Sequence, residues 1–330
     1  MSSSYISSLQ FAEKQVIIYF GCLIFIGGIL GDILNITVFL SLQTFRQSSC
    51  AFYLIIMSIV NIGQLLANVL PRLLGVIIGS DGSETSLFYC KFRLFFTVLC
   101  TIISLNCFCL AMIDQYCATC SRPRLQQLCN MKLARRLILI FSVIWTLYAL
   151  PYYIFFNHII SPTTGKVICA MTNIVYIQFR AYFGSPVVIG FLPIFITVTF
   201  GLMAYRNIQQ MRYYTVPLIR RELDKQLTLI VLAQGAINTI VLSPYTITII
   251  FALTTNVRDD PIFKAQIDFV TDITFTIVWI YYAVSTNKNK IVCELDLYFV
   301  LVSILCIHMC ITSISTTIYS CILQNTFATL

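Results

Sequence analysis

Charged residues are scarce along this chain. Only 10% of its 330 residues are Asp, Glu, Lys or Arg, whereas 58% are hydrophobic and the mean hydropathy is +0.87. A soluble globular domain carries about 25% charged residues, so this chain cannot cover a water-exposed globule of its own size. The low charge therefore excludes a soluble protein and predicts a membrane protein.

Residues for catalysis and for metal or cofactor binding are also few. The two histidines, His158 and His308, do not stand beside a serine or cysteine nucleophile in an identifiable motif, and no glycine-rich phosphate-binding loop is present. We therefore expect no enzyme activity, no cofactor and no metal site. The net charge of +8 would favour nucleic acid as the partner of a soluble protein. Here basic loops beside anionic lipid headgroups explain it, so we expect membrane lipid and no nucleic acid as a partner.

Long apolar runs recur instead from end to end. A helix needs about 20 apolar residues to cross the hydrocarbon core of a bilayer. Seven segments provide them: residues 16–42, 50–78, 87–117, 133–156, 182–205, 227–253 and 262–284. The predicted fold class is all-α, a polytopic membrane protein with a seven-transmembrane helix bundle and an additional hydrophobic C-terminal segment. The predicted regions are an extracellular N-terminus (1–14), the bundle (15–284) and the atypical segment (285–330).

The distribution of Lys and Arg predicts the orientation. With the N-terminus outside, the three cytoplasmic connections hold eleven basic residues: Arg46, Arg122, Arg124, Lys132, Arg135, Arg136, Arg206, Arg212, Arg220, Arg221 and Lys225. They hold only two clear acids, Glu222 and Asp224. Because basic loops stay in the cytoplasm, we expect the N-terminus outside. The first dozen residues lack the basic region of a signal peptide, so we expect no cleavage there.

Several landmark residues fall in a fixed order along the predicted helices. They are Cys90, Asp114, Gln115, Tyr116, Trp145, Cys169, Pro193 and Pro244. Cys90 precedes the third helix, and the triplet from Asp114 to Tyr116 closes that helix 24 residues later. Over about residues 15–284, this pattern resembles the rhodopsin-like family of G protein-coupled receptors.

The resemblance implies a multi-pass receptor of the plasma membrane that binds an extracellular ligand and activates a heterotrimeric G protein. Asp114, Gln115 and Tyr116 would then form the G protein-coupling triplet, while Pro193 and Pro244 would be helix pivots. A disulfide between Cys90 and Cys169 is also expected from the charge rule, since both lie on the outer, oxidising side. Two free thiols are the alternative.

The chain departs from the family at two polar sites. Gln115 stands where the family has an arginine, which implies either raised basal activity or poor coupling to the transducer. Asp32 and Asn61 are exchanged relative to the buried asparagine and aspartate of the resembling family. We expect them to form an intramembrane polar pair that keeps the first two helices in contact, with Asn35 as the alternative partner.

The seventh predicted helix lacks the family's Asn-Pro-x-x-Tyr sequence. After it comes an eighth apolar run at about residues 295–323, whose far end has a polar residue four before Tyr319. We interpret residues 286–315 as a retained intron or similar gene-model insertion that interrupts this helix. A genuine eighth span is the alternative.

The ligand is expected to be a peptide or a chemosensory compound. The third helix has no carboxylate where amine receptors carry one, and the seventh has no lysine inside its membrane portion to bind retinal. Candidate pocket residues in the outer halves of the helices are Arg93, Thr97, Arg180, Ser185, Tyr245 and Asp268. Arg93 would either meet an anionic ligand or extend to the membrane interface. A non-signalling decoy receptor and a transporter or channel are the alternative functions.

Overall fold

The structure, a computed structural model, describes residues 2–41, 43–160, 165, 167–210, 218–254 and 261–283. Almost all of these residues are helical, and one two-stranded hairpin is the only sheet among them. The predicted class, a polytopic helical membrane protein, is confirmed. The hairpin is an addition to the all-α prediction. Its strands, β1 (Phe156–Ile160) and β2 (Val167–Met171), are antiparallel, and His158 pairs with Cys169.

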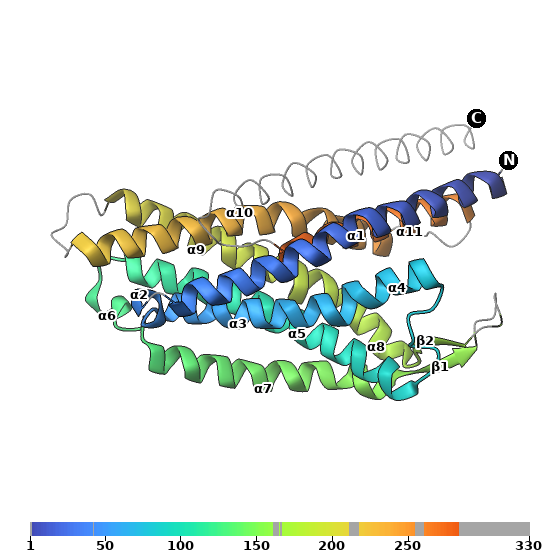
Figure 1. Cartoon of the computed structure of the whole chain (residues 1–330), viewed down its shortest axis with the longest axis horizontal. Helices are drawn as coiled ribbons and strands as arrows, with labels where there is room; N and C mark the ends of the chain where they lie inside the picture. Colours follow the sequence, from blue (N-terminus) through green and yellow to red (C-terminus); the bar gives the residue numbers. More distant parts are fainter. Residues whose placement is uncertain are drawn as a thin grey trace.

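The described residues form a bundle of seven long helical segments that lie side by side (Figure 1). We call each segment a column, because some consist of two or three helices that continue one another. In chain order they are α1 (Ser2–Ser41); α3 (Ser49–Gln64) continued by η1 (Leu65–Val69) and α4 (Leu70–Ile78); α5 (Leu87–Thr119); α7 (Met131–Phe155); α8 (Ile174–Phe179) continued by η2 (Arg180–Phe191) and α9 (Leu192–Gln210); α10 (Leu218–Thr254); and α11 (Pro261–Ala283). The short helices α2 (Gln43–Arg46) and α6 (Pro123–Gln126) lie at the end opposite the hairpin.

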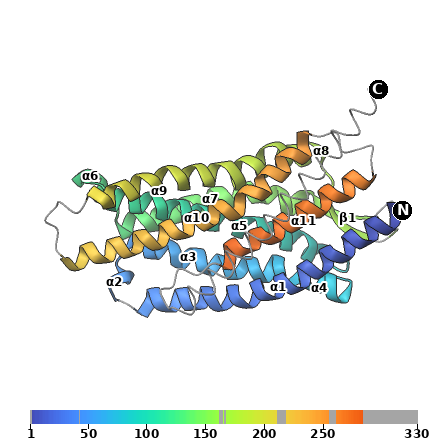
Figure 2. The same cartoon turned by 90° about the horizontal axis from the view of Figure 1, so that it is seen from above.

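Six of these columns are long and apolar enough to cross a membrane within the described residues. The exception is α11, which carries Lys264, Asp268 and Asp272. It nevertheless belongs to the bundle, because it packs against both α1 and α10 (Figure 2). Its Trp279 and Tyr281 are among the most deeply buried large side chains.

Polar residues at the ends of the apolar runs explain where several helices begin and end. The side chains of Ser48, Ser86, Asn130 and Asn173 each accept a hydrogen bond from a backbone N–H in the first turn of the helix that follows. Gly79 ends α4 with a φ of 85°, a left-handed conformation that glycine adopts without strain. The turn at Gly79 starts the short connection that leads to α5.

Three helices begin earlier than their apolar runs predict, one of them α10, which starts at Leu218 rather than at residue 227. The first starts at Ser2 rather than at residue 16, so residues 2–14 continue α1. The fifth column starts at Ile174 rather than at residue 182. Hydropathy detects only the apolar part of a helix, whereas α1 has 40 residues, about 60 Å at 1.5 Å per residue. That exceeds the roughly 30 Å hydrocarbon core. The predicted segment 285–330 lies outside the described residues.

The bundle buries two main apolar clusters and leaves its outer surface apolar. One cluster, in the half that carries the hairpin, centres on Trp279, Tyr281 and Leu65. The other, in the opposite half, includes Phe108 and Met112. The surface of α7 exposes Leu139, Ile140, Val143, Ile144 and Leu147. A continuous exposed apolar face of this kind fits a helix that contacts lipid.

Candidate functional site: polar clusters along the helix bundle

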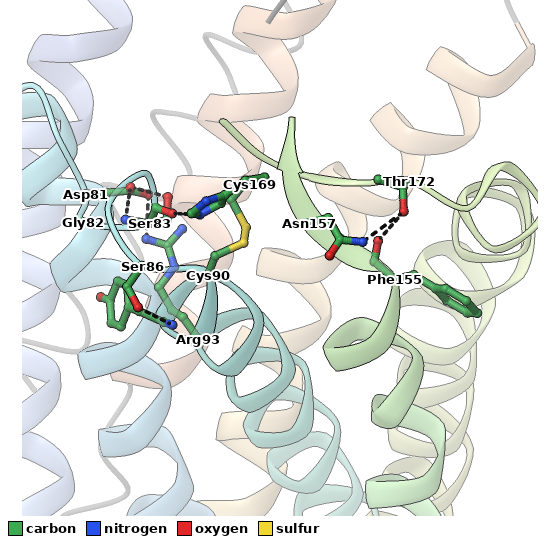
Figure 3. Close-up of a disulfide and its surroundings, with 12 residues drawn as sticks. Asp81, Gly82, Ser83, Ser86, Cys90, Arg93, Phe155, Asn157, Cys169 and Thr172 are labelled. Carbon is green, nitrogen blue, oxygen red and sulfur yellow. Dashed lines mark hydrogen bonds and ion pairs between the residues drawn. A yellow bond between two sulfur atoms is a disulfide. The ribbon is translucent and has the colours of Figure 1, made fainter. Parts of the chain in front are cut away.

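The predicted disulfide is confirmed. Cys90 lies in the first turn of α5 and bonds to Cys169 in β2, with their Cα atoms 5.9 Å apart. The bond ties the hairpin to the top of α5 (Figure 3). We call this end of the bundle, which also carries the chain's N-terminus (Figure 1), the disulfide end. The opposite end is called the Asp114 end.

The loop before α5 is anchored next to this disulfide (Figure 3). Arg93 donates to Asp81 at 2.6 Å, and the Ser83 hydroxyl donates to the other Asp81 oxygen at 2.5 Å. His158, which pairs with Cys169 in the hairpin, makes a 2.7 Å hydrogen bond with the Ser83 carbonyl oxygen. Arg93 therefore has a protein partner, an arrangement that neither of its two sequence interpretations included.

The Asp81 carboxylate is held in its charged form. Burial raises the pKa of the Asp81 carboxyl, but hydrogen bonds from Ser83 and the ion pair with Arg93 outweigh this effect, so the pKa lies below its ordinary value. A lowered pKa in the folded state means that the stabilisation is present above the ordinary value of about 3.9. It is lost only as pH falls through the lowered value.

Asp81→Asn is therefore expected to destabilise the protein equally at about pH 5.5 and about pH 7.5. A charge-assisted hydrogen bond contributes about 2 kcal/mol. The loss of one such bond should lower the melting temperature of Asp81→Asn by about 5 °C. The measurement is thermal unfolding of the full chain in lipid nanodiscs across pH. A destabilisation that disappears between pH 7.5 and pH 5.5 would contradict the assigned ion pair.

A charged cluster lies inside the bundle below the anchored loop. Arg72 of α4 pairs with Asp272 of α11 at 2.5 Å, and their side chains are 28% and 33% exposed. The Arg72 guanidinium also lies over the rings of Phe275 and Trp279, at 5.4 and 5.7 Å from their centroids. Glu13 of α1 interacts with Asp272 and with Arg72. The cluster therefore joins the first, second and seventh columns.

The structure places two of the predicted pocket residues near this cluster. Tyr245 packs against Phe275 with ring centroids 5.6 Å apart, and it interacts electrostatically with Asp272. Asp268 is exposed on α11 and interacts with Asp272 as well. Of the four remaining candidates, Arg93 is paired with Asp81, whereas Thr97 on α5, Arg180 on η2 and Ser185 on η2 are half-buried. No described contact joins Thr97 or Ser185 to Asp272.

The predicted intramembrane pair lies at the contact between α1 and α3. Asp32 is 2% exposed, and its carboxyl group is close to Ser58 and Asn61. The Oδ2 atom of Asp32 and the Nδ2 atom of Asn61 nevertheless do not complete a hydrogen bond with each other. Asn61 Oδ1 instead accepts from Ser104 at 2.5 Å. The alternative partner Asn35 joins the same cluster by donating to Ser58 at 3.5 Å.

This cluster extends from the second column to α11. The Ser104 hydroxyl lies 3.2 Å from the Tyr281 hydroxyl, and Tyr282 donates to Thr101 at 3.1 Å. Two adjacent tyrosines of α11 are thus hydrogen-bonded to α5. The sequence did not predict either of these hydrogen bonds.

The Asp114 end contains the triplet that the sequence singled out. Asp114 and Gln115 have different partners: the Ser49 hydroxyl of α3 donates to Asp114 at 2.7 and 2.9 Å, whereas Thr228 of α10 donates to Gln115 Oε1 at 2.6 Å. Tyr116 packs edge-to-face on Phe200 of α9, with ring centroids 5.6 Å apart. The triplet therefore contacts the second, fifth and sixth columns.

The two predicted pivots occupy different environments. Pro193 is the second residue of α9, which directly follows the π-helical stretch η2, and it is buried. Pro244 lies inside α10, where its ring prevents a backbone hydrogen bond to the carbonyl group of Ile240. The Ser243 hydroxyl donates to that carbonyl oxygen at 3.4 Å. Such a substitute bond lets a membrane helix tolerate a proline.

Sequence reasoning missed Arg72, Ser49 and Thr228. Arg72 could have been found, because an arginine within an apolar run requires a partner, and Asp272 occupies an apolar run on a different helix. The hydroxyl residues Ser49 and Thr228 carry no distinguishing pattern in the sequence. No family model and no curated protein sequence matches the chain, so membership of the rhodopsin-like family stays a prediction.

Proposed function

We propose that this chain is a ligand-activated receptor of the rhodopsin-like G protein-coupled class, located in the plasma membrane. The observation that carries the proposal is the hydrogen bond between Gln115 and Thr228, which links α5 to α10 at the Asp114 end. The same α5 is attached to the hairpin through Cys90 at the disulfide end. One helix thus connects the two ends of the bundle.

The orientation follows from charge and redox chemistry. A disulfide persists on the oxidising side of the membrane, which assigns the disulfide end to the outside. The basic connections then lie in the cytoplasm, as the distribution of Lys and Arg favours. A ligand would bind from the disulfide end, and a heterotrimeric G protein would bind at the Asp114 end.

The resting state would be held by a neutral hydrogen bond. In the resembling family an arginine occupies the position of Gln115, whereas here an amide oxygen accepts from a threonine hydroxyl on α10. Breaking this bond would free the inner part of α10 to swing outward about Pro244. A net contribution of about 1 kcal/mol corresponds to a shift of about five-fold between closed and open states.

Thr228→Val is therefore expected to raise basal nucleotide exchange about five-fold, because it removes the donor to Gln115. The measurement is GTP exchange on a panel of purified G proteins, with the full chain in nanodiscs and no ligand added. Thr239→Val is the matched control, since the Thr239 hydroxyl bonds only within α10, to the Gly235 carbonyl oxygen at 2.8 Å. It should leave the exchange rate unchanged.

Exchange absent from the wild type, from Thr228→Val and from Gln115→Arg would contradict coupling to a G protein. Exchange restored by Gln115→Arg alone would instead support a decoy receptor, whose lost arginine prevents signalling. Solute flux into lipid vesicles that contain the reconstituted chain, measured without any G protein, would favour a transporter or channel.

A further inference from the structure

Arg180 lies within the bundle without a carboxylate partner among the residues whose side chains the structure describes. It is half-buried at the start of η2, inside the fifth column. The other two arginines that the structure describes in this half of the bundle are both paired, Arg72 with Asp272 and Arg93 with Asp81. An ionisable side chain inside a membrane bundle is costly unless it has a partner.

Four tyrosines from three columns lie within electrostatic reach of Arg180. Its charge interacts with the hydroxyl groups of Tyr148 and Tyr152 from α7, Tyr176 from α8 and Tyr245 from α10. The rings of Tyr152 and Tyr176 meet edge-to-face with centroids 5.6 Å apart. Since Tyr245 also interacts with Arg72, the tyrosine group extends toward the centre of the bundle.

The local backbone brings these groups together. A Cβ atom at Gly184 would lie 2.7 Å from the Tyr148 hydroxyl and 3.7 Å from Arg180 Cγ. A larger residue at position 184 would therefore displace the Tyr148 hydroxyl from its place beside η2 and Arg180. The π-helical turns also begin at Arg180, and π-helical segments occur frequently at functional sites.

We propose that Arg180 and the surrounding tyrosine hydroxyls bind the oxyanion of a ligand whose remaining part is apolar or aromatic. This inference specifies the ligand class of the proposed receptor and rests on that function for its biological meaning. A guanidinium group donates two parallel hydrogen bonds to a carboxylate or phosphate, and tyrosine hydroxyls supply further donors. Aromatic rings would cover the apolar part of the ligand.

The test uses 4-phenylbutyrate as the probe and its neutral amide, 4-phenylbutyramide, as the matched compound. The full chain is placed in nanodiscs of phosphatidylcholine, and the melting temperature is measured against the concentration of each compound. The carboxylate is expected to raise the melting temperature, since a ligand that binds only the folded state stabilises it. The amide should give less than a tenth of the carboxylate's apparent affinity.

Arg180→Gln should abolish the carboxylate effect, while Arg124→Gln, an exposed arginine at the Asp114 end, should leave it unchanged. If Arg180→Gln does not fold, Arg180→Lys is measured instead, and its apparent Kd should rise about ten-fold because the ammonium group cannot bind bidentately. Nanodiscs that also contain phosphatidylglycerol identify the source of the oxyanion. A lipid phosphate at the site would stabilise the wild type, but not Arg180→Gln, without any probe.

Equal stabilisation by the amide, or stabilisation that persists in Arg180→Gln, would overturn the proposal. So would the absence of any Arg180-dependent shift with either the carboxylate or the anionic lipid. The assay contains no G protein, so its outcome is separate from that of nucleotide exchange. Binding without exchange would leave the anion site standing and remove the receptor function, and exchange without binding would do the reverse.

Discussion

Cys90→Ala is expected to cause a larger loss of stability than the single substitutions at Asp81, Arg72 or Asp272. The disulfide closes a loop across a sequence separation of 79, and the chain-entropy relation gives about 4.5 kcal/mol as an upper bound for a loop of this length. Helices that stay inserted in the membrane already restrict the unfolded chain, so the measured loss should be smaller. The amount of chain at the cell surface and the melting temperature in nanodiscs are the measurements.

The double variant Cys90→Ala/Cys169→Ala should be no worse than either single variant, because each substitution removes the same bond. Cys22→Ala is the matched control, since Cys22 is a free, half-buried cysteine in α1. Additive losses from the two single variants, or a loss from Cys22→Ala of the same size, would show that the disulfide is not the cause.

The second large effect is expected at the ion pair between Arg72 and Asp272. Arg72→Met leaves Asp272 beside Glu13 and Asp268 with no arginine to offset the three carboxylates. Asp272→Asn leaves Arg72 with Glu13 as a nearby acid. Removing one member of a buried pair costs about 3–5 kcal/mol, and the partial exposure of this pair reduces that to about 2 kcal/mol. Arg72→Met should therefore lower the melting temperature more than Asp272→Asn.

The double variant Arg72→Met/Asp272→Asn should recover part of the loss, because it removes both charges together. Arg124→Met makes the same substitution at an exposed arginine and should be nearly neutral. A double-mutant cycle measured by thermal unfolding gives the coupling between the two residues. A coupling indistinguishable from zero, or a larger loss for Asp272→Asn, is the result inconsistent with this cluster.

The helices were predictable from the sequence because each membrane span is a continuous run of apolar residues, which is a local feature of the chain. The predicted spans 50–78, 87–117 and 227–253 lie within the observed second column, α5 and α10. Helix ends were less predictable where the helix leaves the apolar run, as at Ser2 and Ile174. The hairpin was missed because each strand has only five residues, too few to give a distinct alternating pattern.

Some site residues could likewise be predicted from the sequence, whereas their partners on other helices could not. Cys90 and Cys169 were identified from the family resemblance and because both were expected on the oxidising side, Cys90 at the start of a helix and Cys169 in an outer connection. The partners Thr228 and Ser49 could not be, since they lie 113 and 65 residues from Gln115 and Asp114 and depend on how the columns pack. The interpretation of residues 286–315 as an insertion stays a prediction, which sequencing of the transcript would test.

Orientation is the claim on which the proposed receptor most directly depends, because it assigns the disulfide end to the outside and the Asp114 end to the cytoplasm. An epitope tag placed ahead of Ser2 marks the disulfide end, where the N-terminus lies. Antibody is expected to label this tag on intact cells that express the full chain. Labelling only after the cells are permeabilised would place the disulfide end in the cytoplasm and contradict the account.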